Sequence, residues 1–426
     1  MEKNKTFTIA IVLAIIIAGV GIYVFYDNAA GSSWKSGDKS GRLAVYGNAN
    51  NDDYIDETDV EMIRSIIAGD AEPTPYSDAN QDGAIDGKDI EFVKKMINKE
   101  QKRIFIDIPY NGTTTVSEIN YPVKDVCIAG YEALTVVKSV GMVKEIICLS
   151  GVSGTSFDPI LYSDVYSLPK VGGTVWTISP DEISKYNVKA IVTMDGSSYL
   201  PNHEVFEAAG MDIIRISAAN GIKSLSGIVT LGYLFGAEER SNELIKFFEG
   251  ILDEVNDKVG GLSQSERVTS LFVTMSNYVE GPSSDYFELT TLAGSRNLGD
   301  WDRARIQFFI GDEWLYEKKY QADFIIHSRS LGLGSVNPQN EFNVYSIYFT
   351  KMDAYKNGNY YMLNFSLPPV LRIATMAEIF YPDLFEEGWS LEKVDYYFSN
   401  FHDNLKKSGY DAKTDSTWTL SSRDML

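Results

Sequence analysis

The sequence is poor in the residues that most often build metal centres and covalent cross-links, with two cysteines and three histidines among 426 residues. Two cysteines exclude a disulfide framework and a cysteine-rich zinc site. Cys127 and Cys148 stand in the apolar runs DVCIAG and EIICLSG, so we expect buried strand residues; a cross-strand disulfide is the alternative. The histidines are scattered along the chain, which argues against a zinc or manganese centre built from clustered imidazoles.

Basic residues are also scarce. Lysine and arginine number 38 against 59 acidic residues, giving a net charge of −21. This balance argues against nucleic acid or an anionic membrane surface as a partner. The sequence has neither a glycine-rich phosphate loop nor a nucleophile elbow, so we do not expect an enzyme.

The N-terminus holds one long uncharged apolar run, residues 7–26. About 20 residues span a membrane, whereas a secretory apolar region is typically about 7–15 residues long. Lys3 and Lys5 precede the run and Asp27 follows it, which predicts a cytoplasmic tip at 1–6. We therefore expect a single-pass anchor in the cell membrane, with the bulk of the chain extracellular; signal-peptide cleavage is the alternative. Residues 27–42 are small and polar, as in a flexible linker.

Two stretches further on are near copies: YGNANNDDYIDETDVEMI begins at Tyr46 and YSDANQDGAIDGKDIEFV begins at Tyr76. Both place oxygen-bearing residues at the spacing of an EF-hand calcium loop, namely positions 1, 3, 5, 7, 9 and 12, with a backbone carbonyl at position 7. The predicted ligands of the second loop are Asp78, Asn80, Asp82, Ala84, Asp86 and Asp89, and those of the first are Asn48, Asn50, Asp52, Tyr54, Asp56 and Asp59.

The first loop departs from the pattern at two positions. Position 1 is the amide Asn48 rather than a carboxylate, and position 6 is Asp53 where the second loop has Gly83. Position 6 requires a sharp turn, and we expect Asp53 to tolerate a left-handed conformation there. Because ligand charge tunes calcium affinity, we expect two Ca²⁺ sites, with the second loop the tighter one.

Neither loop is preceded by a stretch long enough for the entering helix of an EF-hand. A calcium loop, an exiting helix, a linker and a repeat of both resemble a type I dockerin over residues 45–99, and we place this small all-α domain at 43–100. The resemblance implies calcium-dependent docking to a cohesin-bearing protein.

From residue 103, apolar strand-like runs alternate with helical stretches, which predicts α/β lobes with a core separate from that of the calcium-loop domain. We place the first lobe at 103–223, a long linking helix at 224–262 that Gly236 divides, and the second lobe at 263–426. The fold class is therefore α/β, with two lobes joined by a helical backbone.

The order of these segments resembles the substrate-binding proteins of ABC importers for iron–siderophore complexes, haem and cobalamin. YPVKDVCIAGYEALTVVKSVGMVKEIICLSG is similar to the opening strand–helix–strand unit, and MDAYKNGNYYML and IATMAEIFYPDLFEEG are similar to the second lobe. The resemblance covers about residues 105–410. It implies a metal-chelate ligand bound between the lobes and an ABC permease as partner.

Ligands of open α/β sheets meet the loops at the carboxyl ends of the strands. Arginines there suit anionic chelates, and tyrosine or tryptophan can stack on a flat ligand. For His327 we keep two readings, a ligand contact and a satisfied core histidine. The predicted cleft residues are Tyr131, Ser153, Ser198, Tyr199, Tyr278, Arg296, Trp301, Arg303, His327, Arg329 and Arg372.

Taken together, these features predict a membrane-anchored extracellular substrate-binding protein of an ABC importer, carrying a calcium-dependent dockerin. The alternative is a cell-surface assembly protein whose main function is the dockerin–cohesin interaction and whose binding-protein-like part is a scaffold or adhesin.

Overall fold

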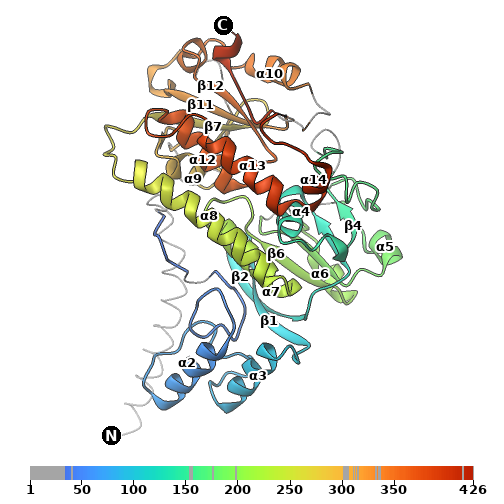
Figure 1. Ribbon diagram of the computed structural model, residues 1–426. Coiled ribbons are helices and arrows are strands. Elements are labelled where there is room, and N and C mark those ends of the chain that lie inside the picture. Colours follow the sequence, from blue (N-terminus) through green and yellow to red (C-terminus); the bar gives the residue numbers. More distant parts are fainter. Residues whose placement is uncertain are drawn as a thin grey trace, which may run out of the picture.

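The computed structural model describes residues 34–39, 42–152, 157–174, 177–196, 199–300, 307–309, 311, 313, 316–331, 333, 337–414 and 417–425 (Figure 1). The predicted anchor at 7–26 lies outside these ranges. Within them, no helix has the length and apolar character needed to cross a membrane.

The calcium-loop domain consists of two loop–helix units, whose helices are α2 (Glu57–Ala68) and α3 (Gly87–Ile97). Each helix begins at an aspartate, Asp56 or Asp86, that forms a capping box with the aspartate three residues later. This pairing satisfies N–H groups that a helix start otherwise leaves without partners. The two helices pack on each other, and their small core contains Ala49, Val60, Ile63, Ala79 and Val93.

A β-hairpin connects this domain to the rest of the chain. Strands β1 (Arg103–Tyr110) and β2 (Thr113–Asn120) pair antiparallel, and β1 also bridges to Val45 of the calcium-loop domain through Ile106. In Figure 1 the hairpin lies between α2–α3 and the green first lobe.

The first lobe has a four-stranded parallel sheet in the order β4-β3-β5-β6. Its elements are β3 (Val126–Ala129), α4 (Tyr131–Ser139), β4 (Ile146–Ser150), α5 (Pro180–Ile183), β5 (Ala190–Met194), α6 (His203–Ala208) and β6 (Asp212–Ile216). Cys127 and Cys148 face each other in register on β3 and β4, buried and with free thiols. This confirms the predicted buried strand residues.

The predicted linking helix is two helices, α7 (Lys223–Phe235) and α8 (Glu238–Val259). Gly236, with φ +69°, ends α7 in the left-handed conformation that glycine adopts without strain. The 22 residues of α8 make a rod of roughly 33 Å that contacts α7 beside the first lobe and α12 in the second (Figure 1).

The second lobe has a mixed sheet in the order β10-β8-β7-β11-β12-β13, with β9 paired to β7. Only β7, β9, β11 and β12 run parallel; β8, β10 and β13 pair antiparallel. The strands are β7 (Thr269–Thr274), β8 (Tyr278–Glu280), β9 (Arg296–Asn297), β10 (Gln307–Phe309), β11 (Phe324–Arg329), β12 (Tyr360–Asn364) and β13 (Thr419–Ser421). The helices are α9 (Phe287–Leu292), α10 (Pro338–Ser346), α11 (Asp353–Lys356), α12 (Pro369–Phe380), α13 (Trp389–Phe401) and α14 (Asp403–Ser408).

The cores are less separate than predicted. Leu43, Val45 and Met96 of the calcium-loop domain belong to the same buried apolar cluster as the first lobe and the helices α7, α8, α12 and α13. The hydroxyls of Tyr46 and Tyr76 both donate to the Asp107 carboxylate on β1, at 3.0 and 3.1 Å. The expectation of independent cores was therefore wrong, because the hairpin and the helical backbone pack directly against the calcium-loop domain.

Candidate calcium loops and interlobe pocket

The second loop has the features of a cation site. Asp78 Oδ2 accepts a hydrogen bond from the Gly83 amide at 2.9 Å, while Asp78 Oδ1 is buried with no hydrogen-bond partner. Gly83 has φ +88°, which explains the glycine at position 6. A buried acceptor without a donor is costly unless a cation or water satisfies it. The donor set of this loop therefore fits calcium.

The other residues of the second loop are arranged around its helix start. Asp89 is buried and accepts from the Asn80 and Asp86 amides, and burial raises its pKa. Asn80 Oδ1 and Asp82 Oδ1 accept from the amides of Asp82 and Ala84. Lys88 Nζ lies 2.8 Å from Asp82 Oδ2, so this ammonium competes for one predicted ligand.

The first loop is satisfied internally. Asn48 is fully buried, and its amide nitrogen donates to the carbonyls of Leu43 and Asp52 at 3.0 and 2.8 Å. Asn50 Nδ2 donates to Asp52 Oδ2 at 2.9 Å and to Thr58. The expected left-handed conformation at Asp53 was wrong, because this residue does not have a positive φ. Position 4 is left-handed in both loops, at Asn51 with φ +60° and at Gln81 with φ +56°.

Burial also acts on the last carboxylate of the first loop. It raises the pKa of Asp59 to about 7, and neighbouring Asp52 and Asp56 add to the effect. The Tyr54 amide donates to Asp52, and Asp56 accepts from Thr58. In the part of the chain that the structure describes, no three His, Cys, Asp or Glu side chains converge as in a formed metal centre.

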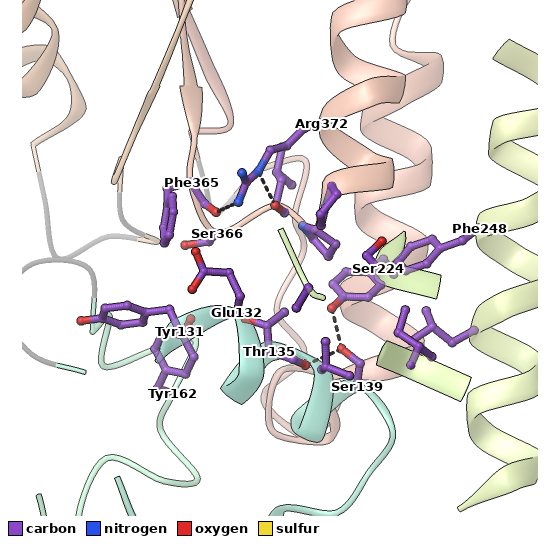
Figure 2. Close-up of a pocket in the computed structure, with 18 residues that line it drawn as sticks. Tyr131, Glu132, Thr135, Ser139, Tyr162, Ser224, Phe248, Phe365, Ser366 and Arg372 are labelled. Atoms are coloured by element: carbon purple, nitrogen blue, oxygen red, sulfur yellow. Dashed lines mark hydrogen bonds between the residues drawn. The ribbon is translucent and has the colours of Figure 1, made fainter. Parts of the chain in front are cut away.

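A pocket lies between the two lobes (Figure 2). One wall is a face of α4, whose residues Tyr131, Glu132, Thr135, Val136 and Ser139 recur at helical spacing. The opposite wall is the segment between β12 and α12, and the two residues that α8 contributes, Leu244 and Phe248, are apolar. The remaining lining residues are Tyr162, Ala218, Ser224, Ile228, Leu244, Phe248, Phe365, Ser366, Leu367, Pro368, Pro369, Arg372 and Tyr397.

Arg372 is the buried cation of this pocket, with 2% of its surface exposed. Its Nε donates to the Leu367 carbonyl at 2.6 Å and its Nη2 to the Phe365 carbonyl at 2.7 Å, while Nη1 has no partner. Burial lowers its pKa, but a guanidinium remains protonated at neutral pH. Arg372 is thus fixed by two hydrogen bonds, and its Nη1 is buried without a hydrogen-bond partner.

Glu132 and the aromatic side chains complete the pocket. Figure 2 shows Glu132 reaching from α4 towards Ser366, and its carboxylate accepts from the Tyr286 hydroxyl at 3.3 Å. Tyr131 packs edge-on against Phe365, with ring centroids 6.3 Å apart. Of the predicted cleft residues, Tyr131 and Arg372 line this pocket, and Glu132, Tyr162 and Phe365, which were not predicted, line it as well. For Glu132 a signal was available, because it follows Tyr131 at the start of the first helix after a buried strand.

Several predicted cleft residues lie elsewhere. Arg296 is exposed and pairs with Thr269 at the first residue of β7, so it lies at the end of the sheet opposite the carboxyl edge. Tyr278 packs against Phe309 on the antiparallel β8–β10 edge and does not line the pocket. Tyr199 lies beside Gly130, close to the start of α4. Ser153, Ser198, Trp301 and Arg303 lie outside the described residues.

His327 is the satisfied core histidine of the two readings. It is fully buried, with Nδ1 2.8 Å from the Tyr360 hydroxyl and Nε2 2.5 Å from the Met275 carbonyl. Burial lowers its pKa to about 3, so it is neutral. Arg329 stacks over Tyr345 at 3.6 Å and pairs with Glu341, away from the pocket. Both residues were predicted to contact a ligand because they lie near the end of a strand. In the structure, residues of α10 pack against both of them.

Carboxylates from both lobes surround the seam beside the pocket. Burial raises the pKa of Asp285 to about 6, and the nearby Asp195 of the first lobe raises it further while Lys223 opposes the shift. Burial likewise raises the pKa of Glu288 to about 7. The seam is therefore acidic, with Arg372 inside the pocket and Lys223 as the cation that interacts with these carboxyls.

Comparison with known proteins identifies one family model that matches part of the chain. Residues 46–98 match the dockerin type I domain family, which confirms the predicted module. Dockerin type I domains generally bind calcium. No curated protein is significantly similar in sequence to the chain.

The remainder has the fold of periplasmic binding proteins. The TroA-like periplasmic binding protein FepB from Veillonella parvula is 18% identical, with a TM-score of 0.56, and the match covers 74% of this chain and 99% of that one. The molybdate-bound MolA of Haemophilus influenzae is 12% identical, covers 67% and 95%, and has a TM-score of 0.56. Helicobacter pylori CeuE with Ni(II) bound is 14% identical, covers 71% and 99%, and has a TM-score of 0.56. The predicted α/β binding-protein fold is confirmed.

Proposed function

We propose that this protein is the substrate-binding receptor of an ABC importer for a metal chelate of the iron–siderophore, haem or cobalamin kind. The observation that supports this proposal is the interlobe pocket. The Nη1 nitrogen of Arg372 is buried there without a hydrogen-bond partner, and much of the remaining lining is apolar. Such a pocket suits a ligand with an acidic group and a larger apolar body, since ligand sites combine apolar area with a few fixed polar anchors.

A bare metal ion is disfavoured as the ligand of this pocket. A bare divalent transition metal ion needs several histidine, cysteine or carboxylate ligands, whereas the pocket offers one carboxylate, Glu132. In a chelate the metal is already coordinated, so the protein contributes only outer contacts. Glu132 then accepts a hydrogen bond from a hydroxyl or amine of the ligand.

The proposed function as a receptor also includes a location of the protein at the cell membrane. Residues 7–26 serve as a single-pass membrane anchor with residues 1–6 in the cytoplasm, and the lobes are extracellular, where they deliver the ligand to a permease. Calcium in the second loop orders the dockerin for a cohesin-bearing partner. Membrane fractionation tests the anchor: recovery of the full chain in the soluble fraction would contradict it.

A ligand screen tests the receptor. The purified chain is heated with ferric siderophores, haemin, cobalamins or bare metal salts. A ligand at a hundredfold excess over its Kd stabilises the fold by about 2.7 kcal/mol. We expect such a shift with one class of chelate, and a shift with zinc or manganese salts alone would contradict the proposal.

The second candidate function is surface assembly, favoured by the specific dockerin match at residues 46–98. In that case the dockerin–cohesin contact is the main activity and the lobes are a scaffold or adhesin. Tight binding to a cohesin, combined with no response to any chelate, would favour assembly over uptake.

A further inference from the structure

The two calcium-type loops differ in a way that the contacts of Asp53 explain. Asp53 stands at position 6 of the first loop, where the second loop has Gly83. It is 7% exposed, and its carboxylate is held by Arg42 through Nε at 3.0 Å and Nη2 at 2.7 Å. A two-pronged arginine–carboxylate pair fixes orientation as well as charge.

The same arginine reaches the lobe-bridging helix. Arg42 Nη1 lies 2.8 Å from Glu249 Oε1 on α8, and Arg42 itself is 6% exposed. Its carbonyl accepts from Ser226 Oγ at 2.7 Å and Thr230 Oγ1 at 3.2 Å on α7. Both α7 and α8 are thus joined to the first loop through Arg42.

The interior of the first loop provides a second, independent observation. At position 1 the Asn48 amide nitrogen donates to two carbonyls, Leu43 and Asp52, and this pair of acceptors fixes which end of the amide is nitrogen. Asn48 Oδ1 accepts from the Asp52 amide. At the matching position of the second loop, Asp78 Oδ1 is buried without any partner. The side-chain N–H groups of Asn48 are therefore hydrogen-bonded within and beside the first loop, whereas the second loop retains a buried carboxylate oxygen without a donor.

We propose that the first loop holds no calcium and serves instead as a metal-free joint that fixes the dockerin to α7 and α8 through Asp53, Arg42 and Glu249. This rests on the calcium part of the proposed function and revises the expectation of two Ca²⁺ sites to one. A fixed joint gives the dockerin one orientation relative to the ligand pocket. A docked partner then holds the receptor lobes in a defined direction rather than on a free tether.

Counting bound calcium tests the first half of the proposal. Native mass spectrometry of the full chain at saturating calcium should find one ion in the wild type and in Asp52→Asn, a first-loop variant, and none in Asp78→Asn. Two ions in the wild type, with one lost in Asp52→Asn, would overturn the metal-free first loop. Loss of binding in Asp78→Asn tests the second loop, so failure of the proposed calcium function and failure of the joint give different results.

Amide hydrogen exchange tests the joint itself. The Tyr46 and Asp107 amides donate across the boundary to the carbonyls of Phe105 and Ala44, at 2.9 and 3.0 Å. Asp53→Gly introduces the residue that the second loop has at position 6 and removes the two-pronged carboxylate partner of the buried Arg42, which then keeps only Glu249. Both amides should therefore exchange faster, by about a hundredfold. Arg42→Lys, which keeps the charge but not the fork, should give a smaller increase.

The matched control is Asp70→Asn, an exposed carboxylate between the two loop–helix units. It should leave the exchange of Tyr46 and Asp107 unchanged. If Asp53→Gly and Arg42→Lys also leave both amides as protected as in the wild type, the joint is refuted.

Discussion

Asp158 and Leu333 join the two lobes by a hydrogen bond from the Leu333 amide to Asp158 Oδ2, at 2.7 Å. Asp158 belongs to a turn of the first lobe, where its Oδ1 accepts from the Ile160 and Leu161 amides. The residue is 1% exposed, so this buried carboxylate is stabilised by three backbone donors. The lobes are thus connected across the seam as well as along α8.

Removing the Asp158 carboxylate should loosen the contact between the lobes. Asp158→Ala leaves three amides without their acceptor, and leaving buried donors unpaired costs about 1–3 kcal/mol each. We expect a lower melting temperature and a larger radius of gyration by small-angle X-ray scattering. Asp181→Ala, at an exposed carboxylate of the same lobe, is the control. An unchanged radius of gyration in Asp158→Ala would show that α8 alone sets the lobe spacing.

Arg372 and Arg296 were both predicted to line the cleft, but only Arg372 lines the interlobe pocket. Arg372→Lys should weaken binding of the chelate found in the screen by about 10- to 100-fold, because lysine lacks the planar fork that is fixed to the Phe365 and Leu367 carbonyls and that has one further nitrogen without a partner. Arg296→Lys should leave binding unchanged, since Arg296 lies at the opposite end of β7. Calorimetric titration of both variants measures this; equal losses in the two would remove Arg372 from the site.

The comparison of Arg372 with Arg296 shows what the sequence could supply. Strand-like runs and helical spacing predicted the parallel sheet of the first lobe, the break at Gly236 and the burial of Cys127 and Cys148. Position along a strand is harder to read: β9 has only two residues, Arg296 and Asn297, so the sequence does not show at which end of the sheet it pairs. The antiparallel edge strands of the second lobe depend on pairing between distant segments.

His327 illustrates the same limit. Its run, FIIHSR, forms β11, but whether a histidine near the end of a strand faces a ligand depends on which helix covers it. Tyr345 and Phe349, from and just beyond α10, pack edge-on against the ring and exclude it from the pocket. The independent core expected for the dockerin failed for a similar reason, since Leu43 and Met96 gain their burial from partners far along the chain.

The neutral state of His327 predicts a pH dependence of stability. Burial lowers its pKa to about 3, against about 6.5 in an unfolded chain. Between these values the unfolded state binds more protons, so stability is fully present above pH 6.5 and is lost as pH falls towards 3. His327→Gln should remove about 2 kcal/mol of the stability loss between pH 7 and 5.

Urea unfolding of the wild type and His327→Gln at both pH values measures this difference. The buried His402 is present in both proteins, so its contribution cancels. Identical pH dependence in the two proteins would mean that His327 is accessible to protons in the native state.

The core that the dockerin shares with the lobes predicts how calcium affects the stability of the whole chain. Because Leu43, Val45 and Met96 pack with the lobes and the Asp107 carboxylate holds Tyr46 and Tyr76, calcium bound at Asp78 should stabilise the whole chain. Scanning calorimetry should show one unfolding transition that moves to lower temperature with a chelator, by an amount that corresponds to about 2.7 kcal/mol when calcium was at a hundredfold excess over its Kd. Asp78→Asn should melt at the chelator-treated temperature with or without calcium.

Lys88→Gln is the informative companion variant. It removes the ammonium that lies 2.8 Å from Asp82 Oδ2, so this carboxylate becomes free to bind the ion and calcium should bind more tightly. The calcium-dependent rise in melting temperature should then be larger than in the wild type at the same calcium concentration. A separate low-temperature transition that alone responds to calcium would show instead that the dockerin unfolds independently of the lobes, in spite of the buried contacts that join them.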